Sequence, residues 1–302
     1  MNRRQFQAAM ASTLLPPLQT GCASTAQRDE SLHLAAVDTH AHVFRRGLTL
    51  ARERRYAPDY DALLADYLGM LDTNGIARGV LVQPSFLGTD NSFLLAALAQ
   101  QPARLRGIAV VAPATPMAEL RRMDGLGVVG IRLNLVGGAA LPDFADGAWR
   151  GLLRRVADLG WQVEVHREAA DLPRILPPLL QAGVNVVVDH FGRPAPAQGV
   201  RDPGFQFLLD AGASRRVWVK LSGAYRNGGN EAGQQIALAA TPLLRNAFGL
   251  DHLVWGSDWP HTQFESKVDY AHARQALDAS LPDPGARHAV LVDTPATLFR
   301  FT

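Results

Sequence analysis

Residues 162–189 read QVEVHREAADLPRILPPLLQAGVNVVVD, and two short apolar runs in this stretch flank a segment with helical spacing. The runs are Gln162–His166 and Val184–Asp189; both are rich in valine, and the second has the nearly continuous apolar character expected for a strand that is covered on both faces. Between them, residues 171–182 repeat leucine and isoleucine at the spacing of a helix. The stretch therefore predicts one strand–helix–strand unit of a parallel sheet.

The same alternation extends in both directions along the chain. A stripe of apolar residues predicts a helix over residues 63–71, and further helices are predicted at 91–101, 116–124, 152–159, 204–214, 234–248 and 268–280. The other strand candidates are Ala35–Asp38, Gly79–Gln83, Gly107–Val111, Val128–Leu133, Val217–Leu221 and Leu253–Gly256. Eight strands that alternate with helices over residues 35–302 predict a single α/β domain with the (β/α)8, or TIM, barrel fold.

A doubly wound dinucleotide-binding fold is the alternative for such an alternation. Residues 125–130 match G-x-G-x-x-G, but these glycines precede a predicted strand, whereas a dinucleotide site needs them after a strand and at the start of a helix. The sequence contains neither a G-x-x-x-x-G-K-[ST] loop nor a G-x-S-x-G elbow. The barrel is therefore the favoured fold.

Composition excludes several classes of protein. The 302 residues are 47% hydrophobic and 19% charged, which is too apolar for a disordered chain. Cys22 is the only cysteine, so the sequence excludes a disulfide framework, a cysteine-based zinc site and an iron–sulfur cluster. Without Arg3 and Arg4, the remaining 28 basic residues balance the 28 acidic ones, which argues against a nucleic-acid partner.

Residues 1–22 are interpreted as an export signal. The start Arg3-Arg4-Gln5-Phe6 resembles a twin-arginine signal, and the apolar run that follows is too short to cross a bilayer. Thr20-Gly21-Cys22 resembles a lipoprotein cleavage site, although Gln19 departs from that pattern. The alternative is a plain signal peptide in which Cys22 is incidental. Residues 23–34 are interpreted as a polar tether, and we expect a periplasmic protein, anchored to the membrane if Cys22 is acylated.

Four side chains at predicted strand ends are the candidate catalytic residues. In a (β/α)8 barrel the chemistry takes place at the C-terminal ends of the strands. His40 and His42 follow the first strand and point the same way, so they can bind one metal ion or polarise one carbonyl group. His190 follows the sixth strand. Asp258 follows the eighth strand, where a carboxylate can take a proton from water.

Other polar residues at strand ends are candidates for substrate binding. Arg132, Arg193 and Arg226 suit carboxylate groups of a substrate, although an internal ion pair is the alternative for Arg132. Lys220 is a weaker candidate, with an ion pair at the barrel rim as its alternative. The remaining candidates for substrate contacts are Ser85, which could instead cap a turn, His166, which could instead bind a metal, and His261.

Five segments together resemble the amidohydrolase superfamily. They are VDTHAH at 37–42, GIRLN at 130–134, DHFG at 189–192, VKLSG at 219–223 and WGSDWPH at 255–261. More narrowly, they resemble the 2-pyrone-4,6-dicarboxylate lactonase group, to which sugar lactonases are similar. The resemblance extends over about residues 35–300.

This resemblance implies a hydrolase that opens a carboxylated lactone. It implies that Asp258 activates water, while His40, His42 and His190 polarise the carbonyl group. Many superfamily members bridge two metal ions with a carboxylated lysine on the fourth or fifth strand; here those strand ends carry Arg132 and His166, so a binuclear centre is not expected. The resemblance implies either no cofactor or one zinc or manganese ion on His40, His42, His190 and Asp258.

Two alternative functions stay open from the sequence. A metal-dependent decarboxylase belongs to related barrels and shares the His-x-His pair and the aspartate. An exported binding lipoprotein with an inactive site is the other, although a binding protein has no need of a base that faces a polarising cluster. In each case the expected partner is a small molecule.

Overall fold

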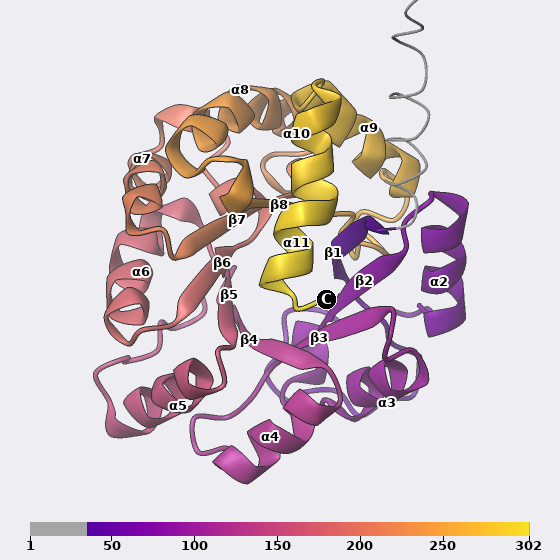
Figure 1. Cartoon of the computed structure of the whole chain (residues 1–302), viewed down its shortest axis with the longest axis vertical. Coiled ribbons are helices and arrows are strands. Elements are labelled where there is room, and N and C mark those ends of the chain that lie inside the picture. Colours follow the sequence, from indigo (N-terminus) through magenta and orange to yellow (C-terminus); the bar gives the residue numbers. More distant parts are fainter. Residues whose placement is uncertain (1–34, 302) are drawn as a thin grey trace, which may run out of the picture.

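The computed structural model describes residues 35–301, which contain eight strands in one sheet (Figure 1). The sheet order is β1 to β8, and each neighbouring pair is parallel. The strands are β1 Val37–Ala41, β2 Arg78–Val82, β3 Leu105–Ala109, β4 Val128–Asn134, β5 Gln162–His166, β6 Asn185–Val188, β7 Val217–Ser222 and β8 Leu253–Gly256.

Helices surround the strands in Figure 1, and the last of them crosses one end of the barrel. They are α2 Leu64–Thr73, α3 Ser92–Gln100, α4 Met117–Gly125, α5 Gly147–Asp158, α6 Leu172–Gln181, α7 Pro203–Ala211, α8 Asn230–Phe248, α9 Tyr270–Ser280, α10 Pro284–His288 and α11 Thr294–Leu298. Their apolar stripes are buried: Tyr67 and Leu71 of α2 and Leu152 of α5 are fully enclosed. Packing of these stripes against the sheet forms the main core.

Hydrogen bonds between β1 and the end of β8 close the sheet into a barrel. Thr39 Oγ1 donates to the carbonyl of Trp255 at 2.8 Å, and the amide of Asp258 donates to the carbonyl of His40 at 2.8 Å. The Asp38 carboxylate accepts from the Ser257 amide at 2.8 Å and from its hydroxyl at 2.6 Å. The predicted (β/α)8 barrel is thereby confirmed.

The N-terminal end of the barrel is filled by the last described residues. Phe299 and Phe301 pack on buried valines of the strands, including Val37 and Val254. Figure 1 shows α11, in yellow, lying against this end of the barrel. Because side chains fill that end, the opposite end, where the strands terminate, is left for a site.

The predicted elements agree closely with the observed ones. Gln162–His166 and Leu253–Gly256 have the predicted bounds, and the other strands differ by one to three residues at one or both ends. The G-x-G-x-x-G match runs from the end of α4 into β4, so it does not open a helix. The predicted signal and tether, with Cys22, lie outside the described residues. Within residues 35–301, no helix is both long and apolar enough to span a membrane.

Candidate active site

The two histidines at the end of β1 meet at the centre of the C-terminal end of the barrel. His40 Nε2 lies 3.3 Å from His42 Nε2, and both side chains are buried. Because a carbonyl oxygen can only accept, His42 Nδ1 donates to the carbonyl of Val82 at 2.7 Å. Burial and the nearby Arg132 lower the pKa of His42 to about 4, so the ring is neutral near pH 7. The lone pair of His42 Nε2 therefore faces the site.

The other ring nitrogen of His40 faces a buried ammonium group. Lys220 Nζ lies 3.1 Å from His40 Nδ1, and the carboxylates of Asp189 and Glu164 lie 3.4 and 3.5 Å from it. Burial and the charge of Lys220 hold the pKa of His40 well below its ordinary value. When Lys220 donates to Nδ1, the single proton of neutral His40 sits on Nε2 and points into the site.

Asp258 has one oxygen held by the protein and one that is free. Its Oδ2 accepts from the Tyr225 hydroxyl at 2.7 Å and from Arg226 Nε. Its Oδ1 has no hydrogen-bond partner in the described part of the chain and lies 3.8 and 3.9 Å from Nε2 of His40 and His42. Burial opposes ionisation, but the guanidinium of Arg226 outweighs it and keeps the pKa of Asp258 well below its ordinary value. Asp258 is therefore an ionised carboxylate with an oxygen aimed at the histidines.

His190 completes the cluster from the end of β6. Its Nδ1 lies 2.8 Å from the hydroxyl of Ser222 on β7, and its Nε2 has no partner among residues 35–301. Its ring centroid is 4.9 Å from that of His40. Burial lowers the pKa of His190 to about 3, so it is neutral near pH 7. A hydrogen bond from Ser222 to Nδ1 leaves a proton on Nε2 that can be donated to a substrate.

Unusual backbone conformations place these side chains. His190 has φ 52° and Asp258 has φ 63°, a left-handed region that non-glycine residues rarely adopt. Gly223, with φ 53°, passes so close that a Cβ would lie 2.7 Å from His190 Nδ1 and 2.9 Å from Asp258 Oδ2. Such conformations persist where the surrounding structure imposes them, and they gather at functional sites.

A layer of paired charges supports the histidines from inside the barrel. Arg132 contacts Asp189 at 3.1 Å and Glu164 at 3.7 Å, and Lys220 contacts Glu164 at 2.5 Å and Asp189 at 3.5 Å. All four side chains are at least 96% buried. Lys220 thus lies in the interior, so the alternative of a rim ion pair is wrong for it, and Arg132 does take part in an internal ion pair.

His166 links this layer to the mouth of the barrel. Arg132 lies 3.3 Å from His166 Nδ1, and Arg193 lies 3.4 Å from His166 Nε2. The pocket above measures about 20 Å³, which is room for about one water molecule. It is lined by His42, Arg55, Tyr56, Arg132, Asn134, His166, His190, Arg226, Asp258, Thr262 and Gln263.

Most of the predicted site residues come together at this mouth. Six of them line the pocket, and His40 lies directly below it. Arg193 lies beside the pocket and contacts His166, which lines it. His261 lies beside the site and contacts Tyr225, whose hydroxyl is 3.3 Å from His261 Nδ1. Ser85 begins a short turn after β2 and is not among the lining residues.

Several residues that contact Asp258 or line the pocket were not predicted from the sequence. Tyr225 lies next to Arg226 in a short turn, and Asn134 is the last residue of β4, so both occupy strand-end positions that could have been considered. Arg55 and Tyr56 belong to the long segment between β1 and α2, where hydrophobic periodicity gives no signal.

The donor atoms at the centre fit one divalent metal ion. Atoms of His40, His42 and Asp258 lie within 4.8 Å of one another. Two imidazole nitrogens and a carboxylate oxygen are a ligand set that zinc binds. The unpartnered Oδ1 of Asp258 and Nε2 of His190, noted above within the described residues, add to this fit.

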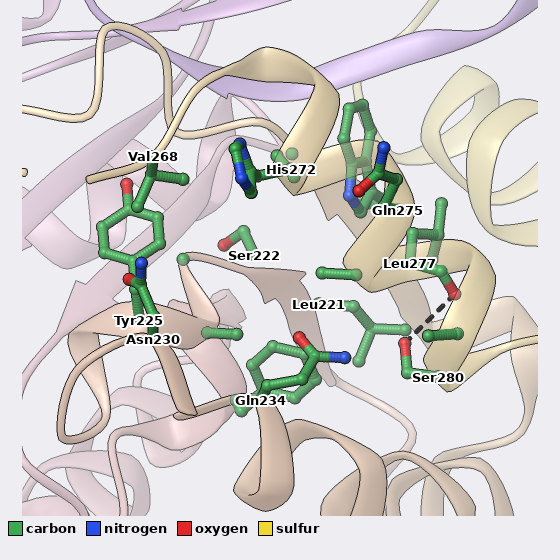
Figure 2. A pocket seen from close by; sticks show the side chains of 18 residues that line it. Leu221, Ser222, Tyr225, Asn230, Gln234, Val268, His272, Gln275, Leu277 and Ser280 are labelled. Atoms are coloured by element: carbon green, nitrogen blue, oxygen red, sulfur yellow. Dashed lines mark hydrogen bonds between the residues drawn. The ribbon is translucent and has the colours of Figure 1, made fainter. Parts of the chain in front are cut away.

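A larger cavity lies behind the wall of the site. It measures about 350 Å³ and lies between β7, β8, α8 and α9 (Figure 2). Figure 2 shows Tyr225 and Asn230 on one side of it and Gln275 and Leu277 on the other. Its lining, which lies wholly within residues 35–301, includes no carboxylate, lysine or arginine. The smaller pocket at the mouth is therefore the one equipped for chemistry.

A parallel barrel whose C-terminal end carries a His-x-His pair, a further histidine and an aspartate is the framework of an enzyme that activates water. The chain belongs to the amidohydrolase family, whose sequence profile matches residues 37–301. The resemblance noted in the sequence is thereby confirmed at the level of the family.

Characterised relatives and solved structures extend this result. The chain is 33% identical over 295 residues to the 4-sulfomuconolactone hydrolase of Rhizobium radiobacter, covering 94% of this chain and 96% of that one. It is 32% identical over 282 residues to the 2-pyrone-4,6-dicarboxylate hydrolase of Comamonas testosteroni, covering 89% and 91%. A crystal structure from Pseudomonas putida, assigned as a 2-pyrone-4,6-dicarboxylic acid hydrolase, has 48% identity and a TM-score of 0.84, covering 89% and 98%.

Proposed function

We propose that this protein hydrolyses a lactone that carries carboxylate or sulfonate groups. The observation that carries the proposal is Asp258, whose Oδ2 is held by Tyr225 and Arg226 while its Oδ1 faces His40 and His42 without a partner in the described chain. A carboxylate fixed in this way is arranged to take a proton from a water molecule.

The reaction follows from the tautomers of the three histidines. Asp258 Oδ1 removes a proton from water, and the resulting hydroxide adds to the lactone carbonyl. His190 Nε2 and His40 Nε2 donate hydrogen bonds to the oxyanion, while the lone pair of His42 Nε2 accepts from the attacking water. The ring C–O bond then breaks, and protonated Asp258 returns the proton to the leaving oxygen.

The choice of substrate class has two supports. The two characterised relatives are named for 4-sulfomuconolactone and 2-pyrone-4,6-dicarboxylate, which are both lactones with anionic groups. The mouth of this barrel carries Arg132, Arg193 and Arg226, and guanidinium groups bind carboxylate and sulfonate oxygens by paired hydrogen bonds.

A form with one divalent metal ion is the second candidate. It is favoured by the close approach of His40 Nε2, His42 Nε2 and Asp258 Oδ1, with His190 as a fourth donor. A zinc or manganese ion held there supplies Lewis-acid polarisation of the carbonyl group. Metal analysis of the purified protein, with activity before and after chelation, distinguishes the two forms: activity that survives complete removal of metal supports the metal-free form.

The variant Asp258→Asn tests the proposal. We expect kcat for lactone hydrolysis to fall by about 10²- to 10⁴-fold with KM little changed, because the amide cannot accept the proton. Wild-type-like turnover by this variant would exclude Asp258 as the base.

A pH-stat distinguishes the decarboxylase alternative, since lactone hydrolysis releases acid whereas decarboxylation consumes it. Ligand binding without turnover in the wild type would favour a binding protein.

We also propose export, on the strength of residues 1–22 alone. Cell fractionation should place the protein in the periplasm, or in the membrane if Cys22 is acylated. A purely cytosolic protein would contradict this proposal.

A further inference from the structure

The arginines at the mouth fall into two groups according to their partners. Arg132 contacts the carboxylates of Asp189 and Glu164, and Arg226 contacts that of Asp258. The guanidinium of Arg193 contacts the neutral His166 ring at 3.4 Å. The guanidinium of Arg55 contacts the neutral amide oxygen of Asn134 at 3.3 Å.

Neither Arg55 nor Arg193 forms an ion pair in the described part of the chain. Carboxylates already compensate much of the charge of Arg132 and Arg226, so Arg55 and Arg193 are the arginines whose charge is least compensated at the mouth. Neutral acceptors orient a guanidinium without cancelling its charge. The mouth therefore presents two positioned cationic groups.

Arg55 reaches across the mouth from the segment between β1 and α2. Its guanidinium lies 5.7 Å from the centre of the Tyr56 ring, and its Cδ passes close to Gly137, where a Cβ would lie only 3.0 Å away. Asn134 ends β4, so the side chain of Arg55 spans the pocket from one side of the barrel to another. Arg55 is also among the residues that line the pocket.

Two hydrogen bonds hold this segment over the barrel. The Tyr56 hydroxyl is 3.0 Å from the Thr262 hydroxyl, and the Tyr60 hydroxyl donates to Glu265 at 2.6 Å. Both partners lie in the loop after β8, so the backbone of the segment is tethered. The pocket beneath, at about 20 Å³, is too small for a lactone ring, so side chains that line it must move for such a substrate to enter.

The segment is also strongly cationic. Residues 45–55 contain five arginines and a single acidic residue, Glu53. Charge of one sign at the mouth of a cleft raises the rate at which an oppositely charged substrate is captured.

We propose that Arg55 binds the second anionic group of a dianionic lactone and makes the enzyme prefer dianionic over monoanionic lactones. On entry of the substrate, Arg55 exchanges its contact with Asn134 for a carboxylate or sulfonate, while Arg193 binds the first anionic group beside His166. This inference rests on the proposed lactone hydrolysis and adds a residue that selects the substrate.

The test compares lactones that differ by one charge. The pairs are 2-pyrone-4,6-dicarboxylate with 2-pyrone-6-carboxylate, and 4-sulfomuconolactone with muconolactone. For Arg55→Met, we expect KM for the dianionic lactone of the active pair to rise by about 10-fold or more, because a charge-assisted contact is lost. The kcat should stay within about threefold, and kinetics with the monoanionic lactone should hardly change. Arg55→Lys, which keeps the charge but not the fork of donors, should fall between wild type and Arg55→Met.

Arg54→Met is the matched control. Arg54 lies next to Arg55, its side chain donates to the carbonyl of Ala51, and it is not among the residues that line the pocket. The two variants lower the charge of the segment equally, so only contact with the substrate separates them. The inference would be overturned if Arg54→Met and Arg55→Met changed KM for the dianionic lactone equally. It would also be overturned if Arg55→Met lowered kcat/KM equally for the dianionic and the monoanionic lactone of a pair. If the wild type hydrolyses none of the four lactones, the proposed function itself fails.

Discussion

At the scale of single residues, Asp258 depends on Arg226 for its charge. Two contacts fix Oδ2, and the guanidinium of Arg226 is the largest of the influences that lower the pKa of Asp258 against the opposing effect of burial. Because a base must be ionised before it can accept a proton, Arg226 sets the lower pH limit of the reaction.

Arg226→Met should therefore move the acid limb of the pH profile. Without the guanidinium, burial dominates and the pKa of Asp258 rises, so kcat/KM should begin to fall at a higher pH than in the wild type. The measurement is kcat/KM between pH 4.5 and 8. As a comparison, Arg193→Met should raise KM and leave the limb in place, since Arg193 contacts His166. An unmoved acid limb in Arg226→Met would show that Arg226 does not control Asp258.

Gly223 is a second residue on which the site depends. Its φ of 53° and its closeness to His190 and Asp258 leave no room for a methyl group. Gly223→Ala should lower kcat by about 100-fold, because displacement of reacting groups by about 1 Å has effects of that size.

Gly183→Ala separates this effect from backbone strain. Gly183 has φ 85°, but a Cβ there would meet no atom within 4 Å. Gly183→Ala should lose about 1 kcal/mol of unfolding free energy from the strained backbone, and Gly223→Ala at least as much because of the added clash, while only Gly223→Ala should lose activity. Activity assays and urea unfolding of the two proteins check this expectation, and full activity in Gly223→Ala would refute it.

At the scale of elements, β4, β5, β6 and β7 each contribute to the buried charge layer. Arg132 and Glu164 are register partners on β4 and β5, and Lys220 reaches them from β7. Above pH 7, where Glu164, whose pKa is raised to about 7, is ionised, two cations and two carboxylates balance, and removal of one member of such a set leaves an uncompensated buried charge.

Lys220→Met should lower the unfolding free energy by about 3–5 kcal/mol, because Glu164 and Asp189 then share only Arg132. The double variant Lys220→Met, Glu164→Gln restores the balance as one cation and one carboxylate, so it should recover part of that loss. Urea unfolding of the wild type, both single variants and the double variant measures the coupling. If the losses of unfolding free energy in the two single variants simply added up in the double variant, Lys220 and Glu164 would not be coupled, which would contradict their pairing in this layer.

The elements themselves were largely predictable, and much of the site was not. Short segments rich in β-branched or aromatic residues identified β5 and β8 with their observed bounds, because strand-forming residues between turn signals carry a strong local signal. That His40, His42, His190 and Asp258 lie together followed from the rule that the C-terminal ends of all strands meet at one end of such a barrel. The partners of Lys220 could not be predicted, because they depend on closure of the sheet. Arg55 was missed because its position is set by tertiary contacts of an irregular segment.

At the scale of the whole molecule, the barrel encloses five neutral imidazoles. Burial is the leading cause of a lowered pKa in each, with values of about 4 for His42, about 3 for His190 and about 4 for His261, and lowered pKa values also for His40 and His166. In the unfolded chain each imidazole takes up a proton near pH 6.5. The contribution of these imidazoles to the unfolding free energy is therefore fully present above pH 6.5, and it is lost as the pH falls toward about 4.

Glu164 acts in the opposite direction. Burial and Asp189 raise its pKa to about 7, so in the folded protein it keeps a proton that the unfolded chain releases near pH 4.5. Its contribution to stability grows as the pH falls from 7 to 4.5. One carboxylate is set against five imidazoles, so the imidazoles dominate the pH dependence.

We expect the unfolding free energy to fall by about 5 kcal/mol between pH 7 and pH 5, which is a large part of the stability of a typical domain. Urea unfolding at half-unit pH intervals, with a chelator present so that bound metal does not contribute, measures this slope. His261→Asn removes one buried imidazole and should reduce the slope by up to about 1.4 kcal/mol per pH unit, because one proton fewer distinguishes the two states. A stability that is flat over this range would mean that the imidazoles bind protons equally in both states, and the neutral tautomers on which the proposed reaction depends would then be wrong.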